Sequence, residues 1–311
     1  MTTAEPRFVL VTRRTRLDEL LQRYTTLDQA RFYVEHLGAD FGDYLAEHAA
    51  YEKALKTVAE TLAACGRVQR IERNVLPTFV FPPDTLVVAL GQDGLVANTL
   101  KYVGARPVLG VNPDPKRWDG VLLPFAPRDL PMLIPDCVKG RRPKRAVTLA
   151  RATLTDGQVL HAVNDLFIGQ RSHVSARYEL AWGQQRERQS SSGILVSTGL
   201  GSTGWLRSVL TGAAGVEHGN ETDEAQGLRT KGLAWDAGEL VFSVREPFPS
   251  KTTGTGLVFG RVNTQHPLTV VSHMPDNGVI FSDGMEADAL VFPAGMTATI
   301  DLAAHRGCLL H

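Results

Sequence analysis

The chain of 311 residues changes character near residue 136, and this change restricts its fold more than any other feature. Before it, apolar runs typical of buried strands alternate with helical patterns: Phe8–Val11, a helical stretch from Leu17 to about Ala64, and Leu86–Leu90. After it, short strand-like runs follow one another between turn residues. We therefore predict an α/β domain with a parallel sheet over 1–135 and a mostly-β domain over 136–311, whose last residues could return to the first domain.

Composition restricts the class of partner. The chain is 43% hydrophobic and 21% charged, as in globular proteins, and Lys+Arg and Asp+Glu are both 33, so the formal net charge is zero. A neutral balance gives no sign of nucleic-acid binding. Cys65, Cys137 and Cys308 lie far apart and indicate a reducing compartment. With no membrane-length apolar run and no signal-peptide pattern, we expect a cytoplasmic protein without a membrane partner.

A G-x-G-x-x-G pattern, Gly199–Gly204, follows the apolar run Ile194–Val196. It has the outline of a dinucleotide fingerprint, which would suggest an oxidoreductase. That fingerprint belongs on the first strand–helix turn of a sheet, whereas this one occurs late and is followed by strand patterns. The oxidoreductase hypothesis is therefore weak.

A second glycine-rich loop, Gly91-Gln92-Asp93-Gly94, directly follows the predicted strand Leu86–Leu90. In open α/β sheets, ligands bind at the carboxyl ends of strands, and glycines there let the backbone approach phosphate. An aspartate in such a loop can accept a hydroxyl proton or hold Mg²⁺. An ordinary β-turn explains the same residues equally well.

Several stretches, taken in order, resemble the NAD kinase family and cover nearly the whole chain. The family's G-G-D-G loop corresponds to Gly91–Gly94, and its Asn-Glu/Asp pair to Asn164-Asp165 in "AVNDLFIG". Its serine- and threonine-rich segment corresponds to "SGILVSTGLGSTGW", and its late Asp-Gly pair to Asp283-Gly284. "VNPDPKRWDG", "FSVREP" and the helical insertion around "QRYTTLDQA" look most like the mitochondrial-type branch and its bacterial relatives.

The resemblance implies a kinase in which an α/β domain and a β domain share a nucleotide cleft. Such an enzyme transfers the γ-phosphoryl group of ATP, or of polyphosphate, to the 2′-hydroxyl of the adenosine ribose of NAD, with Mg²⁺, and forms NADP. By resemblance, Asp93 would activate this hydroxyl, and Gly91, Gln92 and Gly94 would bind the phosphates. The NAD-binding residues would be Asn164, Asp165, Ser192, Thr198, Ser202, Thr203 and Trp205. The family oligomerises, so we expect a homodimer, and no residue of the chain is assigned to a metal.

Each of these residues also has a purely structural explanation. Asn164-Asp165 is a common strand-end turn, and Ser202 and Thr203 could cap a helix, which is worth about 1 kcal/mol. A lone aromatic residue such as Trp205 is more often part of a core. The histidines show no metal-ligand spacing, and we interpret His161, His173 and His273 as structural.

The chain departs from the family pattern at Gln92, Leu95, Ser192 and Leu200. If Gln92 needed a positive φ, its side chain would cost roughly 1–2 kcal/mol. These departures leave two alternatives open: a kinase acting on another acceptor (NADH, a sugar or a lipid diol), and a non-catalytic protein that binds NAD or NADP. We further expect residues 215–232, which are polar, to form a mobile loop.

Overall fold

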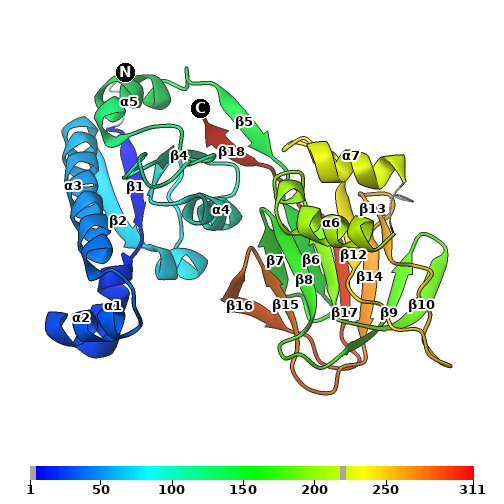
Figure 1. The fold of residues 1–311 in the computed structure, drawn as a ribbon. Coiled ribbons are helices and arrows are strands. Elements are labelled where there is room, and N and C mark those ends of the chain that lie inside the picture. Colours follow the sequence, from blue (N-terminus) through cyan, green and yellow to red (C-terminus); the bar gives the residue numbers. More distant parts are fainter. Residues whose placement is uncertain (1–4, 218–221) are drawn as a thin grey trace. The chain divides into compact units, whose positions relative to one another are not determined.

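The computed structural model describes residues 5–217 and 222–311, which divide into two compact units (Figure 1). The first comprises the residues up to Arg145 together with Cys308–His311, and the second comprises Ala146–Gly307. The first unit extends past residue 135, where the sequence placed its end, because the helix Leu130–Val138 packs into its core. The final strand also lies in its sheet.

The first unit is built on a six-stranded sheet of order β2-β1-β3-β4-β18-β5. Its pairings from β2 to β18 are parallel, as predicted. The strands are β1 (Arg7–Thr12), β2 (Arg67–Glu72), β3 (Thr85–Leu90), β4 (Pro107–Val111), β5 (Lys144–Val147) and β18 (Gly307–Leu310).

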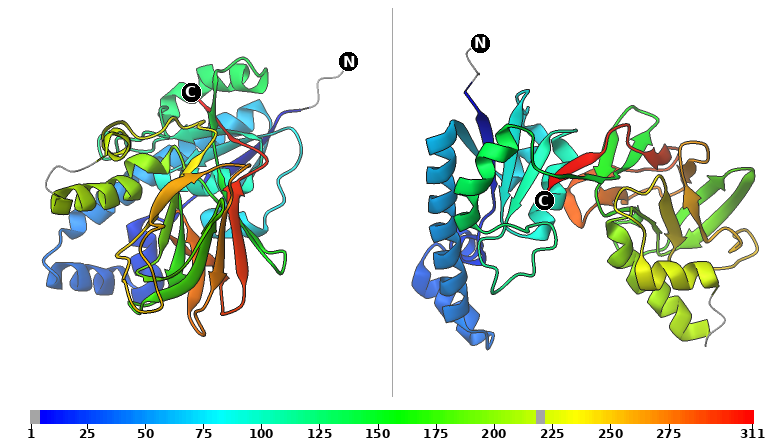
Figure 2. Two further views of the ribbon diagram at one scale, coloured as in Figure 1. Left: turned by 90° about the vertical axis from the view of Figure 1, so that its right-hand side faces the viewer. Right: turned by 90° about the horizontal axis from the view of Figure 1, so that it is seen from above.

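Helices cover both faces of this sheet, which explains why β3 is buried along its whole length. α3 and α5 pack on one face, as the right-hand view of Figure 2 shows in blue and green, and α4 contacts β3 and β4. The helices are α1 (Arg16–Tyr24), α2 (Leu27–His36), α3 (Phe41–Cys65), α4 (Asp93–Tyr102) and α5 (Leu130–Val138), with short 3₁₀ turns η1 (Arg73–Thr78) and η2 (Pro127–Asp129).

The helical stretch predicted from Leu17 is divided into three helices by its capping residues. Thr15, Thr26 and Asp40 each accept a backbone hydrogen bond in the first turn of the helix that follows. Gly66 ends α3, where a Cβ would come within 2.3 Å of the Pro6 carbonyl oxygen. The sequence therefore fixes where each helix begins through short polar side chains.

The second unit consists of two six-stranded sheets whose strand pairings are antiparallel. The first sheet has the order β10 (Gln185–Ser191), β9 (Ala176–Trp182), β14 (Leu268–Ser272), β17 (Thr297–Leu302), β6 (Ala150–Leu154), β7 (Val159–Ala162). The second has the order β13 (Phe259–Val262), β12 (Leu240–Val244), β11 (Ile194–Ser197), β8 (Asp165–Gln170), β15 (Gly278–Ser282), β16 (Met285–Val291).

One core joins the inner faces of these two sheets and includes Leu166, Ile168, Leu180 and Ile300. The outer face of the second sheet carries α6 (Trp205–Glu217) and α7 (Asp223–Lys231), preceded by the 3₁₀ turn η3 (Gly201–Thr203). Leu195 and Leu206 belong to the smaller core beneath these helices. The residue after β11 contacts the residue before β8, because the Thr198 N–H donates to the Asn164 carbonyl oxygen at 2.9 Å.

The structure corrects one prediction in this region. Residues 215–232 are not simply a loop: they contain the end of α6 and the helix α7, whose N-cap is Thr222. Residues 218–221 of that stretch lie outside the described residues. The helix escaped prediction because its residues are mostly polar and only Leu228 is buried.

Candidate functional site

The Gly91–Gly94 loop joins β3 to α4 at the carboxyl end of the parallel sheet. The Gly91 N–H donates to the Val111 carbonyl oxygen at 3.1 Å, which ties the loop to the neighbouring strand β4. A Cβ on Gly91 would come within 2.9 Å of the Leu95 side chain and 3.4 Å of that of Arg13. A larger residue at position 91 would therefore have to displace the buried Leu95 side chain, so glycine suits the close packing where α4 begins.

Asp93 is the first residue of α4 and is half-buried. Its Oδ1 accepts a hydrogen bond from the Leu122 backbone N–H at 2.6 Å. Leu122 belongs to the segment that follows β4, so this bond links the loops after two adjacent strands. The carboxylate is held in place while the first amides of α4 present the positive end of a helix dipole next to it.

Gln92 does not carry the backbone strain considered above. Its φ is −119° and its ψ is 165°, an extended conformation that every residue can adopt. It is the N-cap of α4, without a side-chain capping bond. The expected cost of a non-glycine residue here is therefore absent.

A buried ionic contact adjoins the loop, and the sequence reasoning missed it. Arg13 follows β1 and donates through Nη2 to Glu47 Oε1 at 2.8 Å, while its backbone N–H donates to the Tyr51 hydroxyl at 3.0 Å. That hydroxyl donates to the Leu90 carbonyl oxygen at 3.2 Å, so α3 is joined to the ends of β1 and β3. Arginine directly after a buried strand was the available signal.

The second group of predicted residues lies at the start of β8, in the second unit. Asn164 and Asp165 form the turn from β7 into β8, and Asp165 lies opposite Ser197 of β11 in the sheet. Asp165 Oδ1 is buried and has no hydrogen-bond partner among the described residues. A buried carboxylate oxygen without a donor indicates that a ligand could supply one.

The environment of Asp165 shifts its titration. Burial raises the pKa of the Asp165 carboxyl to about 7, the Ser197 hydroxyl opposes this, and the nearby charge of Asp283 adds to it. This carboxyl therefore changes its protonation near neutral pH. Such behaviour is typical of functional sites.

Thr198 and Ser202 are fully buried, and their hydroxyls are engaged within the protein. Thr198 Oγ1 donates to the Val163 carbonyl oxygen at 2.5 Å. Ser202 Oγ donates to the Gly199 carbonyl oxygen at 2.7 Å and accepts from the Leu233 N–H at 2.8 Å. Thr198 therefore holds the backbone of the Asn164 turn, whereas Ser202 ties η3 to the segment that follows α7.

The sequence suggested that Ser202 and Thr203 could cap the helix that follows them, but α6 begins after Gly204 instead. The Gly204 carbonyl accepts the bond from the Ser208 N–H that opens α6, and the exposed Thr203 donates back to Leu200 instead.

Trp205 is part of a stacked aromatic row on the outer face of the second sheet. Its ring lies 5.7 Å from that of Phe167, which lies 4.8 Å from that of Phe281. The Arg245 guanidinium lies 5.4 Å from the centre of the Trp205 ring. Ser192 is exposed on the turn between β10 and β11.

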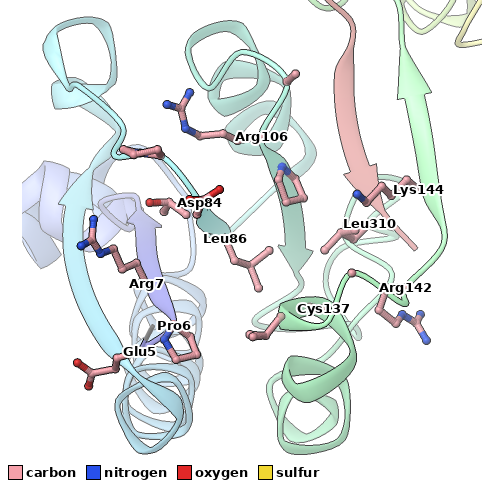
Figure 3. Close-up of a pocket in the computed structure, with 16 residues that line it drawn as sticks. Glu5, Pro6, Arg7, Asp84, Leu86, Arg106, Cys137, Arg142, Lys144 and Leu310 are labelled. Atoms are coloured by element: carbon pink, nitrogen blue, oxygen red, sulfur yellow. The ribbon is translucent and has the colours of Figure 1, made fainter. Parts of the chain in front are cut away.

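A cavity of about 890 Å³ lies in the first unit, at the opposite ends of the strands from Gly91–Gly94. Pro6, Leu86, Cys137 and Leu310 are among its lining residues, and Figure 3 shows the guanidinium groups of Arg7 and Arg142 pointing away from Leu86. The guanidinium groups of Arg7 and Arg142 therefore do not converge on one point of this cavity.

Among the described residues, no cluster of three or more His, Cys, Asp or Glu side chains could hold a metal ion. Within residues 5–217 and 222–311, no helix has the length and apolar character needed to span a membrane.

Comparison with known proteins places the fold. No protein-family model matches the chain, and no curated protein matches its sequence. Among solved structures, it is similar to an NAD kinase from Archaeoglobus fulgidus in complex with ATP, at TM-score 0.55 and 14% identity, covering 98% of this chain and 93% of the other. It is also similar to yeast NADH kinase complexed with NADH, at TM-score 0.57 and 14% identity, covering 99% and 84%.

The chain therefore has the fold of NAD kinases, with an α/β unit and an antiparallel β unit. The fold class predicted from the sequence is confirmed. At 14% identity the likeness establishes the fold alone.

Proposed function

We propose that this protein is a kinase that phosphorylates the 2′-hydroxyl of the adenosine ribose of NAD or NADH, with ATP as the phosphoryl donor. The observation that carries the proposal is the loop Gly91–Gly94, which occupies the carboxyl end of β3 in an NAD kinase fold and holds Asp93 at the start of α4. The two similar structures contain ATP and NADH, respectively.

In the proposed reaction, Asp93 accepts the proton of the 2′-hydroxyl as the ribose oxygen attacks the γ-phosphorus. The bond between the γ-phosphorus and its bridging oxygen breaks, and ADP leaves. Phosphoryl transfer proceeds through a loose transition state, so positioning and charge neutralisation supply most of the catalysis. The hydrogen bond from Leu122 to Asp93 Oδ1 supports a positioned base, and the first amides of α4 suit an anionic phosphate.

Dinucleotide binding is proposed for the Asn164-Asp165 turn. A ribose diol can donate to the buried Asp165 Oδ1, which has no other partner in the described chain. The Asn164 side-chain amide offers both a donor and an acceptor for an adenine edge or a ribose. We assign Ser192, Thr203 and Trp205 to the rim of this site, and Thr198 and Ser202 to its support.

Mg²⁺ fits this chemistry as a partner of the ATP phosphates. In proteins Mg²⁺ commonly keeps several water ligands and binds substrate phosphates, which ATP would supply here. Bound Mg²⁺ would neutralise charge that develops on the phosphates.

The homodimer expected from the family also stays a prediction, and sedimentation of the purified chain tests it.

The test is product formation. The protein is incubated with Mg²⁺ and ATP together with either NAD or NADH, and NADP or NADPH is detected with an NADP-specific dehydrogenase. The expected result is phosphorylated product, and the ratio of kcat/KM for the two acceptors defines the substrate. Polyphosphate replaces ATP in a parallel series. Tight NAD binding without product from either donor would contradict the proposal and favour the non-catalytic alternative.

A further inference from the structure

We propose that Asp283 is a positioning residue that fixes the backbone of the Asn164-Asp165 turn and places a carboxylate directly against it. This inference rests on the proposed dinucleotide site and extends it to a residue far away in the sequence.

Asp283 lies in the two-residue turn that joins β15 to β16. It and Gly284 have φ values of 54° and 69°, and Ser282 pairs with Met285 across the turn. Positive φ at both central positions is the pattern of a type I′ hairpin, for which Asp-Gly is a favoured sequence. The turn directs the Asp283 side chain onto the neighbouring strand β8.

The carboxylate of Asp283 accepts hydrogen bonds from three consecutive backbone N–H groups. Oδ1 accepts from Val163 at 3.1 Å, Asn164 at 2.6 Å and Asp165 at 3.2 Å, and Oδ2 accepts from Val163 at 3.0 Å. The Asp283 N–H also donates to the Asp165 carbonyl oxygen at 3.0 Å. Successive N–H groups form a concave anion-binding site, and here the anion is a side chain of the protein itself.

The carbonyl side of the same turn is held by Thr198. Its Oγ1 donates to the Val163 carbonyl oxygen at 2.5 Å, and its N–H donates to the Asn164 carbonyl oxygen at 2.9 Å. The turn is therefore fixed through its amides by Asp283 and through its carbonyls by Thr198. Asn164 and Asp165, the two residues proposed to bind the dinucleotide, therefore have a fixed backbone. Less conformational entropy is then lost when the ligand binds.

Asp283 also acts through its charge. The negative charge of Asp283 disfavours ionisation of the Asp165 carboxyl, whereas the Ser197 hydroxyl favours it. After burial itself, this negative charge helps to raise the pKa of Asp165. Ligand hydroxyls that donate to Asp165 favour its ionised form, so NAD binding should release a proton near neutral pH.

If Asp283 had a purely structural role, it would only stabilise the β15–β16 hairpin. Asp283→Asn separates the two roles because it keeps a side-chain acceptor for the backbone amides and removes the charge. Asp283→Ala removes both. Glu286→Gln is the matched control, because Glu286 is an exposed carboxylate on the same hairpin.

The first measurement follows the ¹³C carboxyl resonance of Asp165 against pH in the protein without ligand. We expect Asp283→Asn to move its titration to lower pH and Glu286→Gln to leave it unchanged. Because no nucleotide is present, this result does not depend on the proposed kinase activity. An unchanged midpoint in Asp283→Asn would overturn the charge role.

The second measurement is NAD affinity across the same pH range. For Asp283→Ala we expect the dissociation constant to rise about tenfold, the change given by losing one hydrogen bond to a charged group, with substantial rescue in Asp283→Asn. If the variants only lower the melting temperature and bind NAD as the wild type does, the positioning role is wrong. Failure of the wild type to bind NAD would instead refute the dinucleotide site, while the Asp165 titration would still decide the charge role.

Discussion

At the scale of the residue, burial of Asp165 makes the stability of the protein depend on pH. Its folded-state pKa is raised to about 7, above the value of the unfolded chain. The native state therefore binds more protons, and this contribution to stability is complete below the unfolded pKa and is lost as pH rises towards about 7. Relative to Asp165→Asn, the wild type should lose up to about 1.4 kcal/mol per pH unit in this window.

Urea unfolding of both proteins between pH 5 and pH 8 checks this. A difference in unfolding free energy that stays constant with pH would show that the Asp165 carboxyl is not withdrawn from water.

Gln92 provides a second residue-scale prediction. Because its φ is −119°, restoring the glycine of the family pattern relieves no strain. We expect Gln92→Gly to leave the free energy of unfolding unchanged or to lower it by up to about 1 kcal/mol, since glycine adds freedom to the unfolded chain. Chemical denaturation measures this. A stability gain of 1–2 kcal/mol, the amount expected from relieving a positive φ, would contradict the extended conformation.

At the scale of the element, the 3₁₀ turn η3 packs directly on the Asn164-Asp165 turn. A Cβ on Gly201 would come within 2.2 Å of the Asn164 carbonyl oxygen, whereas one on Gly212, within α6, would meet nothing within 4 Å. Gly201→Ala should therefore displace the turn, weaken NAD binding and destabilise the protein. Gly212→Ala should stabilise it by about 0.5–1 kcal/mol through helix propensity.

Thermal unfolding and NAD titration of the two glycine variants test this contrast. Equal behaviour of the two would mean that η3 does not support the dinucleotide-binding turn.

At the scale of the whole molecule, the chain returns to its first unit at the very end. β18 lies between β4 and β5, and its Leu309 and Leu310 are each 2% exposed. Removing Cys308–His311 therefore deletes an interior strand, and we expect the first unit to lose cooperative unfolding. Removal of the exposed His311 alone should have little effect. Circular dichroism during heating distinguishes the two, and an unchanged transition in the longer truncation would contradict the strand order.

Much of this architecture could be predicted from the sequence because its strands and helices carry strong patterns. β1 and β3 coincide with the predicted apolar runs Phe8–Val11 and Leu86–Leu90, and the Gly91–Gly94 loop was expected at the end of a strand. The polar strand β10 and the helix α7 were missed, because neighbouring elements rather than their own periodicity stabilise them.

Site residues were predictable only in part. The local motifs indicated Asp93 and Asn164-Asp165, but the contacts that hold these residues come from far along the chain. Leu122 binds Asp93 through a backbone N–H, which no side-chain pattern reveals. Asp283 binds the amides of the Asn164 turn across more than a hundred residues of sequence, and only the sheet pairing brings them together.

The measurement that tests the central claim most directly compares Asp93→Asn with Asp119→Asn in NADP or NADPH formation. Asp119 is an exposed aspartate in the segment after β4 and serves as the matched control. Loss of a general base typically lowers the rate by about 10²–10⁴-fold, so we predict a fall of this size in kcat for Asp93→Asn, with NAD affinity retained and Asp119→Asn as active as the wild type. Equal turnover by both variants would show that Asp93 is not the base and would contradict the proposed reaction.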